Sequence, residues 1–126
     1  MTVKLDSISQ ISVNAHDISR ATAFYRDVLG LRHLFDAGPR MSFFDCGGVR
    51  LMLTLPEKPE YDHPSSIVYF TVKNIQQAHA ELSANGVQFE REPHLVAPMP
   101  THDLWMAFLR DSEGNLMALT SAIAKR

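Results

Sequence analysis

The sequence has few of the features that would tie it to a membrane or an oxidising compartment. Cys46 is its only cysteine, so no internal disulfide can form, and a reducing compartment fits. Its apolar runs are only a few residues long, and its first six residues lack the apolar centre of a signal peptide. We therefore expect a cytoplasmic protein that does not bind membranes.

The chain also has no large excess of positive or negative charge. The chain carries 12 basic and 14 acidic residues, and its basic residues do not cluster. A nucleic-acid backbone attracts proteins through concentrated positive charge, so we expect no nucleic-acid partner. Gly47 and Gly48 are typical of a hairpin turn rather than a phosphate-binding loop, because no helical pattern follows them.

The first half of the chain has the pattern of a strand, a helix and three further strands. Apolar and polar residues alternate from Ile8 to Ala15, which predicts a half-buried strand. Asp17 is a suitable cap for a helix, and Gly30 is a suitable end for it. The three strands that we predict next are Leu31 to Phe35, Met41 to Asp45 and Val49 to Thr54.

The second half repeats this order. A strand is predicted from Ile67 to Val72, followed by a helix that Asn74 caps, with Gln77 in the capping-box position, and that ends at Gly86. The remaining strands are predicted at Val87 to Glu90, Leu104 to Arg110 and Leu116 to Ser121. A long loop is expected from Pro93 to Pro100, because this stretch contains three prolines.

These patterns predict one α+β domain over residues 1–126, made of two tandem βαβββ modules. The first module covers about residues 5–54 and the second about residues 66–122. A proline-rich linker at about residues 55–65 joins them.

Two segments carry a resemblance to a known family. The stretches Gln10 to Leu31 and Phe108 to Leu119 resemble the vicinal oxygen chelate superfamily, which includes glyoxalases, extradiol dioxygenases and bleomycin-resistance proteins. Ser112 stands where most members have proline. The resemblance implies a cupped, eight-stranded mixed sheet, built from two four-stranded halves, with the helices on its outer face and a ligand site in the concavity.

The resemblance also implies where a metal ion would bind. Metal-dependent relatives hold a divalent ion at positions that correspond to Gln10, Met52, Ile67 and Ala118. Hard divalent ions need about three oxygen or imidazole ligands, and only Gln10 offers one. We therefore predict no metal and no other cofactor. A divalent metal in a non-standard site remains the alternative.

The residues that we expect to line the ligand pocket come from the strand alternation and from the loop before the predicted strand at Leu104. They are Gln10, Asn14, Arg50, Met52, Ile67, Tyr69, His102, Trp105 and Ala118. Two roles are open for Arg50, a clamp for a carboxylate or phosphate and simple exposure at the rim. Trp105 either stacks on a planar ligand or packs in the core. His102 either anchors the loop, with Asp103, or acts as an acid and base.

Two functions follow from these observations. The first is a metal-free protein that binds a small organic ligand in the concavity. The alternative is a glyoxalase-type lyase, isomerase or dioxygenase that uses a non-standard metal site or His102, so enzymatic activity is left open. We also expect a homodimer, because modules of related folds pair within one chain or across two.

Overall fold

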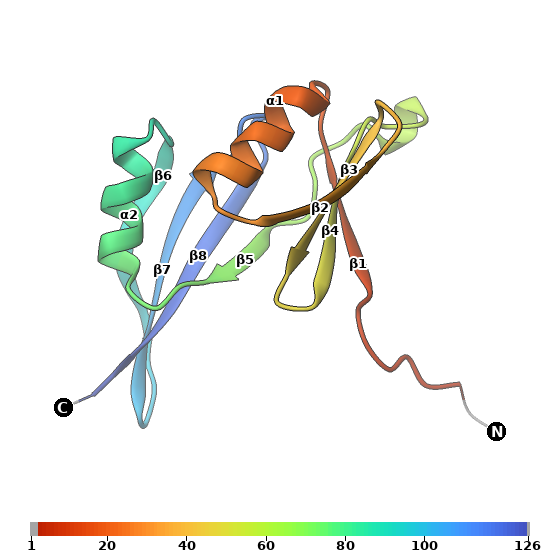
Figure 1. The fold of residues 1–126 in the computed structure, drawn as a ribbon. Helices are drawn as coiled ribbons and strands as arrows, with labels where there is room; N and C mark the ends of the chain where they lie inside the picture. The colour runs from red at the N-terminus through yellow and green to blue at the C-terminus, as the bar shows by residue number, and fades with distance from the viewer. Residues whose placement is uncertain (1–2, 126) are drawn as a thin grey trace. The chain divides into compact units, whose positions relative to one another are not determined.

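The computed structural model describes residues 3–125, and the chain divides into two compact units between His63 and Pro64. The first unit contains a strand, a short helix continued by a π-helical turn, three more strands and a 3₁₀ turn. These elements are β1 (Gln10–Asn14), α1 (Ile18–Ala23), the π-helical turn (Phe24–Val28), β2 (Arg32–Ala37), β3 (Met41–Cys46), β4 (Val49–Thr54) and the 3₁₀ turn (Pro59–Tyr61) (Figure 1).

The four strands of the first unit form one mixed sheet in the order β1-β4-β3-β2. β1 runs parallel to β4, and the other neighbours are antiparallel. Helix α1 packs against β3 and β4. The core lies between this helix and the sheet, where Tyr25, Phe44 and Leu51 are fully buried and the rings of Tyr25 and Phe44 lie 6.0 Å apart.

The ends of the first helical segment are as the sequence predicts. The side chain of Asp17 accepts a hydrogen bond from the backbone N–H of Arg20 at 3.0 Å, which satisfies a donor that the helix leaves unpaired. The π-helical turn is closed by a bond of 3.0 Å from the N–H of Leu29 to the carbonyl of Phe24. Gly30 then adopts a positive φ of 75°, which ends the helix.

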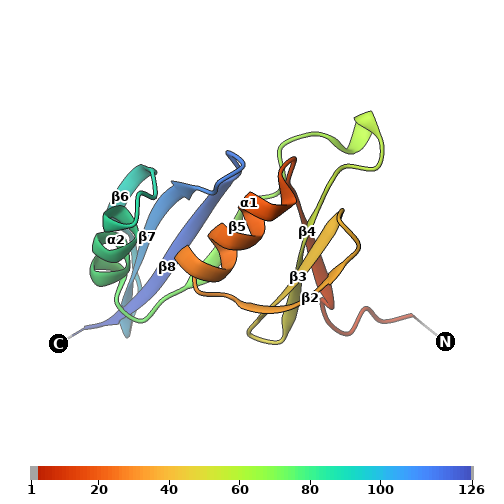
Figure 2. The ribbon, with the colours of Figure 1, turned by 45° about the horizontal axis from the view of Figure 1, so that its top comes forward.

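The second unit contains a strand, a helix and three longer strands. These elements are β5 (Val68–Thr71), α2 (Ile75–Ala84), β6 (Phe89–Pro98), β7 (His102–Arg110) and β8 (Leu116–Ala124). The sheet has the order β5-β8-β7-β6, with β5 parallel to β8, and α2 packs against β6, β7 and β8 (Figure 2). Ile75, Leu109 and Met117 form the buried centre of this unit.

The predicted cap of the second helix is also present. The Oδ1 atom of Asn74 accepts from the backbone N–H of Gln77 at 3.0 Å. The side chain of Gln77 makes a different contact from the one the capping box implies, because its amide nitrogen donates to Glu81 Oε1 at 3.0 Å. No helix in residues 3–125 is long and apolar enough to cross a membrane.

The α+β class and the two βαβββ modules are therefore confirmed, as two mixed sheets of four strands each with one helical segment per module. The predicted loop from Pro93 to Pro100 is wrong, because β6 continues to Pro98. Proline lacks the N–H that a central strand must donate, but β6 lies at the edge of its sheet. Its pairing with β7 also has three register shifts, which accommodate the irregular backbone.

Candidate functional site

The face of the first sheet that is turned away from α1 is defined by strand register. Gln10 pairs with Arg50 and Ser12 with Met52 across β1 and β4, and Met52 pairs with Phe43 on β3. These residues alternate with buried residues such as Leu51, so their side chains lie on the opposite face. We call this surface the first open face: Gln10, Ser12, Asn14, Phe35, Phe43, Asp45, Arg50, Met52 and Thr54.

Arg50 lies over two phenyl rings on the first open face. Its guanidinium carbon is 5.7 Å from the ring centre of Phe35 and 5.6 Å from that of Phe43. The two rings stack with their centres 4.6 Å apart and their planes 22° apart. Phe43 is only 7% exposed, whereas Phe35 is 44% exposed. The arrangement is an aromatic platform with a cation above it.

Sequence reasoning missed Phe35 and Phe43. The pairing of β2 with β3 shifts register between His33 and Phe35, so plain alternation from His33 places Phe35 on the wrong face. Phe43 and Phe44 are adjacent and both apolar, so the pattern does not say which ring enters the core. The one hint in the sequence is that two adjacent phenylalanines on a strand must point to opposite faces, so one of the two rings lies on the open face.

Gln10 and Met52 contact each other on the same face. The side-chain nitrogen of Gln10 donates to the sulfur of Met52 at 3.7 Å. Both residues occupy positions that the family resemblance assigns to metal ligands. They provide one amide oxygen and one thioether, and thioethers prefer soft metals such as Cu(I).

The second unit has its own face turned away from its helix. Tyr69 on β5 pairs with Ala118 on β8, which pairs with Phe108 on β7. The rings of Tyr69 and Phe108 meet edge to face across this alanine, with their centres 6.2 Å apart, and Ala118 is fully buried. We call Ile67, Tyr69, His94, Phe108 and Ala118 the second open face.

The remaining residues of the second open face are also apolar or aromatic. Phe108 stacks on the ring of His94, with centres 6.4 Å apart and planes 24° apart. Ile67 immediately precedes β5 and is 41% exposed, and Tyr69 is 50% exposed. Ile67 and Ala118, like Met52, therefore bring no oxygen or imidazole ligand to the positions that the resemblance assigns to a metal.

His102 and Trp105 lie on β7 but not beside Ala118. His102 is the first residue of β7, half-buried, with its Nδ1 3.2 Å from Thr101 Oγ1. His102 is six positions before Phe108 along the strand, a distance of about 20 Å at the usual rise per residue. Trp105 is two residues before the buried Ala107 and shares its face, which is opposite to the face of Phe108. Asp103 forms an ion pair with Lys125 at 3.4 Å.

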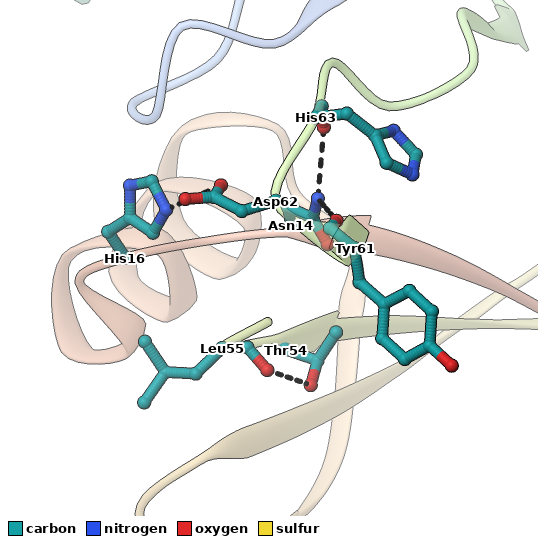
Figure 3. Close-up of polar contacts among 7 residues, drawn as sticks. All are labelled: Asn14, His16, Thr54, Leu55, Tyr61, Asp62 and His63. Carbon is teal, nitrogen blue, oxygen red and sulfur yellow. Dashed lines mark hydrogen bonds and ion pairs between the residues drawn. The ribbon is translucent and has the colours of Figure 1, made fainter. Parts of the chain in front are cut away.

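Asn14 binds the linker that follows the first unit's last strand. Its side-chain nitrogen donates to the carbonyls of Tyr61 at 2.8 Å and His63 at 3.0 Å, as Figure 3 shows. His16 reinforces the attachment, because its Nε2 lies 2.9 Å from Asp62 Oδ1. We call these contacts the linker clamp; they hold residues 61–63 at the end of β1.

A surface pocket of about 370 Å³ lies beside the linker clamp. Its walls are His16, Arg40, Asp62 and residues 55–59. Sequence reasoning placed Asn14 in the ligand pocket and gave His16 no particular role. In the structure Asn14 holds the linker backbone, a contact that no local sequence pattern would have indicated.

The acidic, histidine and cysteine side chains do not converge on a metal position. No group of three or more of them within residues 3–125 is placed to hold a metal ion. Burial, with the negative charge of Asp45, raises the pKa of the Cys46 thiol, so the reactive thiolate is disfavoured at neutral pH. The donor set at Gln10, Met52, Ile67 and Ala118 does not fit a hard divalent ion either.

Comparison with protein families decides the relationship that the sequence suggested. The model of the "Glyoxalase/Bleomycin resistance protein/Dioxygenase superfamily" matches residues 7–119. The chain belongs to this superfamily. The match covers both βαβββ modules and both open faces, so the superfamily's scaffold extends over almost the whole chain. The sequence has no significant match among curated proteins.

Several solved structures share the fold. A lactoylglutathione lyase from Agrobacterium tumefaciens is 21% identical, with a TM-score of 0.72 over 94% of this chain and 95% of its own. A superfamily member from Sphaerobacter thermophilus is 21% identical, with a TM-score of 0.75 over 93% and 98%. A virulence protein from Salmonella typhimurium is 19% identical, with a TM-score of 0.78 over 96% and 100%. At these identities the likeness establishes the fold alone.

The linker clamp predicts that Asn14 contributes to stability. Replacing Asn14 with Ala leaves the carbonyls of Tyr61 and His63 without this donor, and we expect a loss of about 1 kcal/mol or more in the free energy of unfolding. Urea unfolding followed by circular dichroism measures the loss. Ser12→Ala, two residues earlier on the same face of β1, is the matched control and should change stability by less than about 0.5 kcal/mol. Equal effects of the two substitutions would contradict the assigned role.

The contact across Ala118 predicts that a glutamate at this position destabilises the fold. In Ala118→Glu the new side chain must displace the rings of Tyr69 and Phe108 and bury a charge, so we expect a loss of about 2 kcal/mol or more. Thr120→Glu places the same residue on the same face of β8, at a half-buried position, and should cost less. A tolerated glutamate at Ala118, measured by the same unfolding experiment, would refute the packing account.

Proposed function

We propose that this protein binds a small organic molecule on an open face of one of its sheets and does so without the divalent metal ion of its metal-dependent relatives. The observation that carries the proposal is the packing at Ala118. This position has no donor atom, is fully buried, and lies between the rings of Tyr69 and Phe108. An aromatic contact therefore occupies the position that the resemblance assigns to a metal ligand.

The other three positions support the same conclusion. Ile67 is a hydrocarbon and Met52 is a thioether, so neither is a suitable ligand for Mg²⁺, Mn²⁺, Fe²⁺ or Zn²⁺. Gln10 keeps an amide oxygen, but its amide nitrogen is directed at the sulfur of Met52. A catalytic metal site supplies about three protein ligands, whereas these four positions supply one neutral oxygen.

The exposed rings support an organic ligand. Phe35 and Tyr69 are 44% and 50% exposed on the faces opposite the helices, although each buries part of its ring against another aromatic side chain. Exposed aromatic surface next to a few polar groups is typical of small-molecule sites. The single cysteine is consistent with a place in the reducing cytoplasm.

The enzymatic alternative lacks a comparable observation. His102 was its candidate acid and base, and it lies about 20 Å along β7 from Phe108. A proton-transfer group must be within hydrogen-bond reach of the atom it serves. We therefore leave catalysis by His102 out of the proposal.

Metal analysis tests the proposal. Protein purified from medium that contains manganese, iron, nickel and zinc should hold far less than one metal ion per chain by mass spectrometry. EDTA should leave its melting temperature unchanged, because removing a ligand lowers the melting temperature only when that ligand binds the folded state.

The control is titration of the purified protein with Mn²⁺ and Ni²⁺, with the melting temperature as the readout. No rise is expected. One tightly bound ion per chain whose removal by EDTA lowers the melting temperature would overturn the proposal.

A further inference from the structure

We infer that the ligand of the first open face is an aromatic carboxylate, with its carboxylate on Arg50 and its ring against Phe35. This inference rests on the proposed function, because it names the chemical class of the molecule bound there. Three features support it: the guanidinium of Arg50 has no carboxylate partner in residues 3–125, Phe35 is partly exposed, and the guanidinium lies close to the Phe35 ring.

The guanidinium of Arg50 is available to an anion. Arg50 is exposed, and it forms no ion pair with any carboxylate in residues 3–125. Asp45 is its direct partner across β3 and β4, yet no ion pair joins the two side chains. The guanidinium lies instead over the rings of Phe35 and Phe43, at 5.7 and 5.6 Å.

In the part of the chain that the structure describes, residues 3–125, no side chain pairs with the guanidinium donors of Arg50, while the two rings limit its motion. A guanidinium has five N–H donors in one plane, and phenyl rings do not satisfy them as carboxylates do. Contact with the two rings restricts the side chain, so less freedom remains to be lost when a ligand binds. A carboxylate matches the planar fork with two parallel hydrogen bonds.

The exposed ring of the aromatic platform indicates what the ligand carries beside its carboxylate. Phe43 is almost fully covered, whereas its stacked neighbour Phe35 is 44% exposed. A flat ring placed on Phe35 extends the existing stack, because aromatic rings prefer offset or edge contacts of this kind. A carboxylate attached directly to that ring then lies within reach of the same guanidinium that contacts Phe35.

Binding of 2-naphthoate tests the inference. Calorimetry on the intact protein should show that 2-naphthoate binds, that 2-naphthamide of the same shape binds at least about tenfold more weakly, and that acetate and inorganic phosphate do not compete. The tenfold figure reflects the loss of a charge-assisted contact. The amide retains the ring but lacks the negative charge and one of the two acceptor oxygens.

Substitutions test whether Arg50 causes the preference for naphthoate over naphthamide. Arg50→Gln should weaken 2-naphthoate about tenfold and leave 2-naphthamide unchanged, whereas Phe35→Leu should weaken both. Arg50→Lys keeps the charge but lacks the planar fork, and should give an intermediate affinity. Arg32→Gln is the matched control, since it removes the same charge from β2 of the same sheet, and should alter binding less than about twofold.

The outcomes separate this inference from the proposed function. Equal affinity for naphthoate and naphthamide, no binding of either, stronger binding of phosphate than of naphthoate, or an unchanged Arg50→Gln variant would each overturn the inference. If neutral aromatic compounds bind and metal analysis finds no metal, the proposed function stands without it. Stoichiometric metal overturns the proposed function whichever naphthyl compound binds.

Discussion

The parallel pairing of β1 with β4 determines which side chains the first open face presents. Gln10 is held opposite Arg50 and Ser12 opposite Met52, while Leu51 and Leu53 enter the core beneath α1. Strand side chains alternate with a period of two, so a slip of one residue would send Arg50 into the core and Leu51 to solvent. The burial of these leucines therefore fixes the register and, with it, the chemistry of the face. β5 and β8 impose the same constraint on Tyr69 and Ala118.

Aromatic contacts are present on both open faces. On the second face an alanine between two strands lets the rings of Tyr69 and Phe108 meet above it. On the first, Phe35 and Phe43 stack beneath Arg50. The superfamily's scaffold is preserved over residues 7–119, so the difference lies in the side chains at its equivalent positions. The side chains at these positions are the reason for proposing binding rather than metal-dependent chemistry.

The parts of the fold that depend on local interactions could be predicted from the sequence. Asp17 and Asn74 cap their helices through contacts within three residues, and Gly30 needs only its own backbone freedom. Contacts that depend on distant segments could not. Phe35 reaches the open face through a register shift, β6 accommodates Pro93 because it is an edge strand, and Asn14 binds a carbonyl 49 residues away. Each outcome depends on a neighbour that the local pattern does not contain.

The most direct test is a crystal structure of the protein grown with both Mn²⁺ and 2-naphthoate, with data collected to reveal the anomalous signal of manganese. The account predicts naphthoate density with its carboxylate on Arg50 and its ring on Phe35. It also predicts no anomalous peak beside Gln10, Met52, Ile67 or Ala118. A manganese peak coordinated by Gln10, with the organic molecule bound to the metal rather than to Arg50, would contradict it.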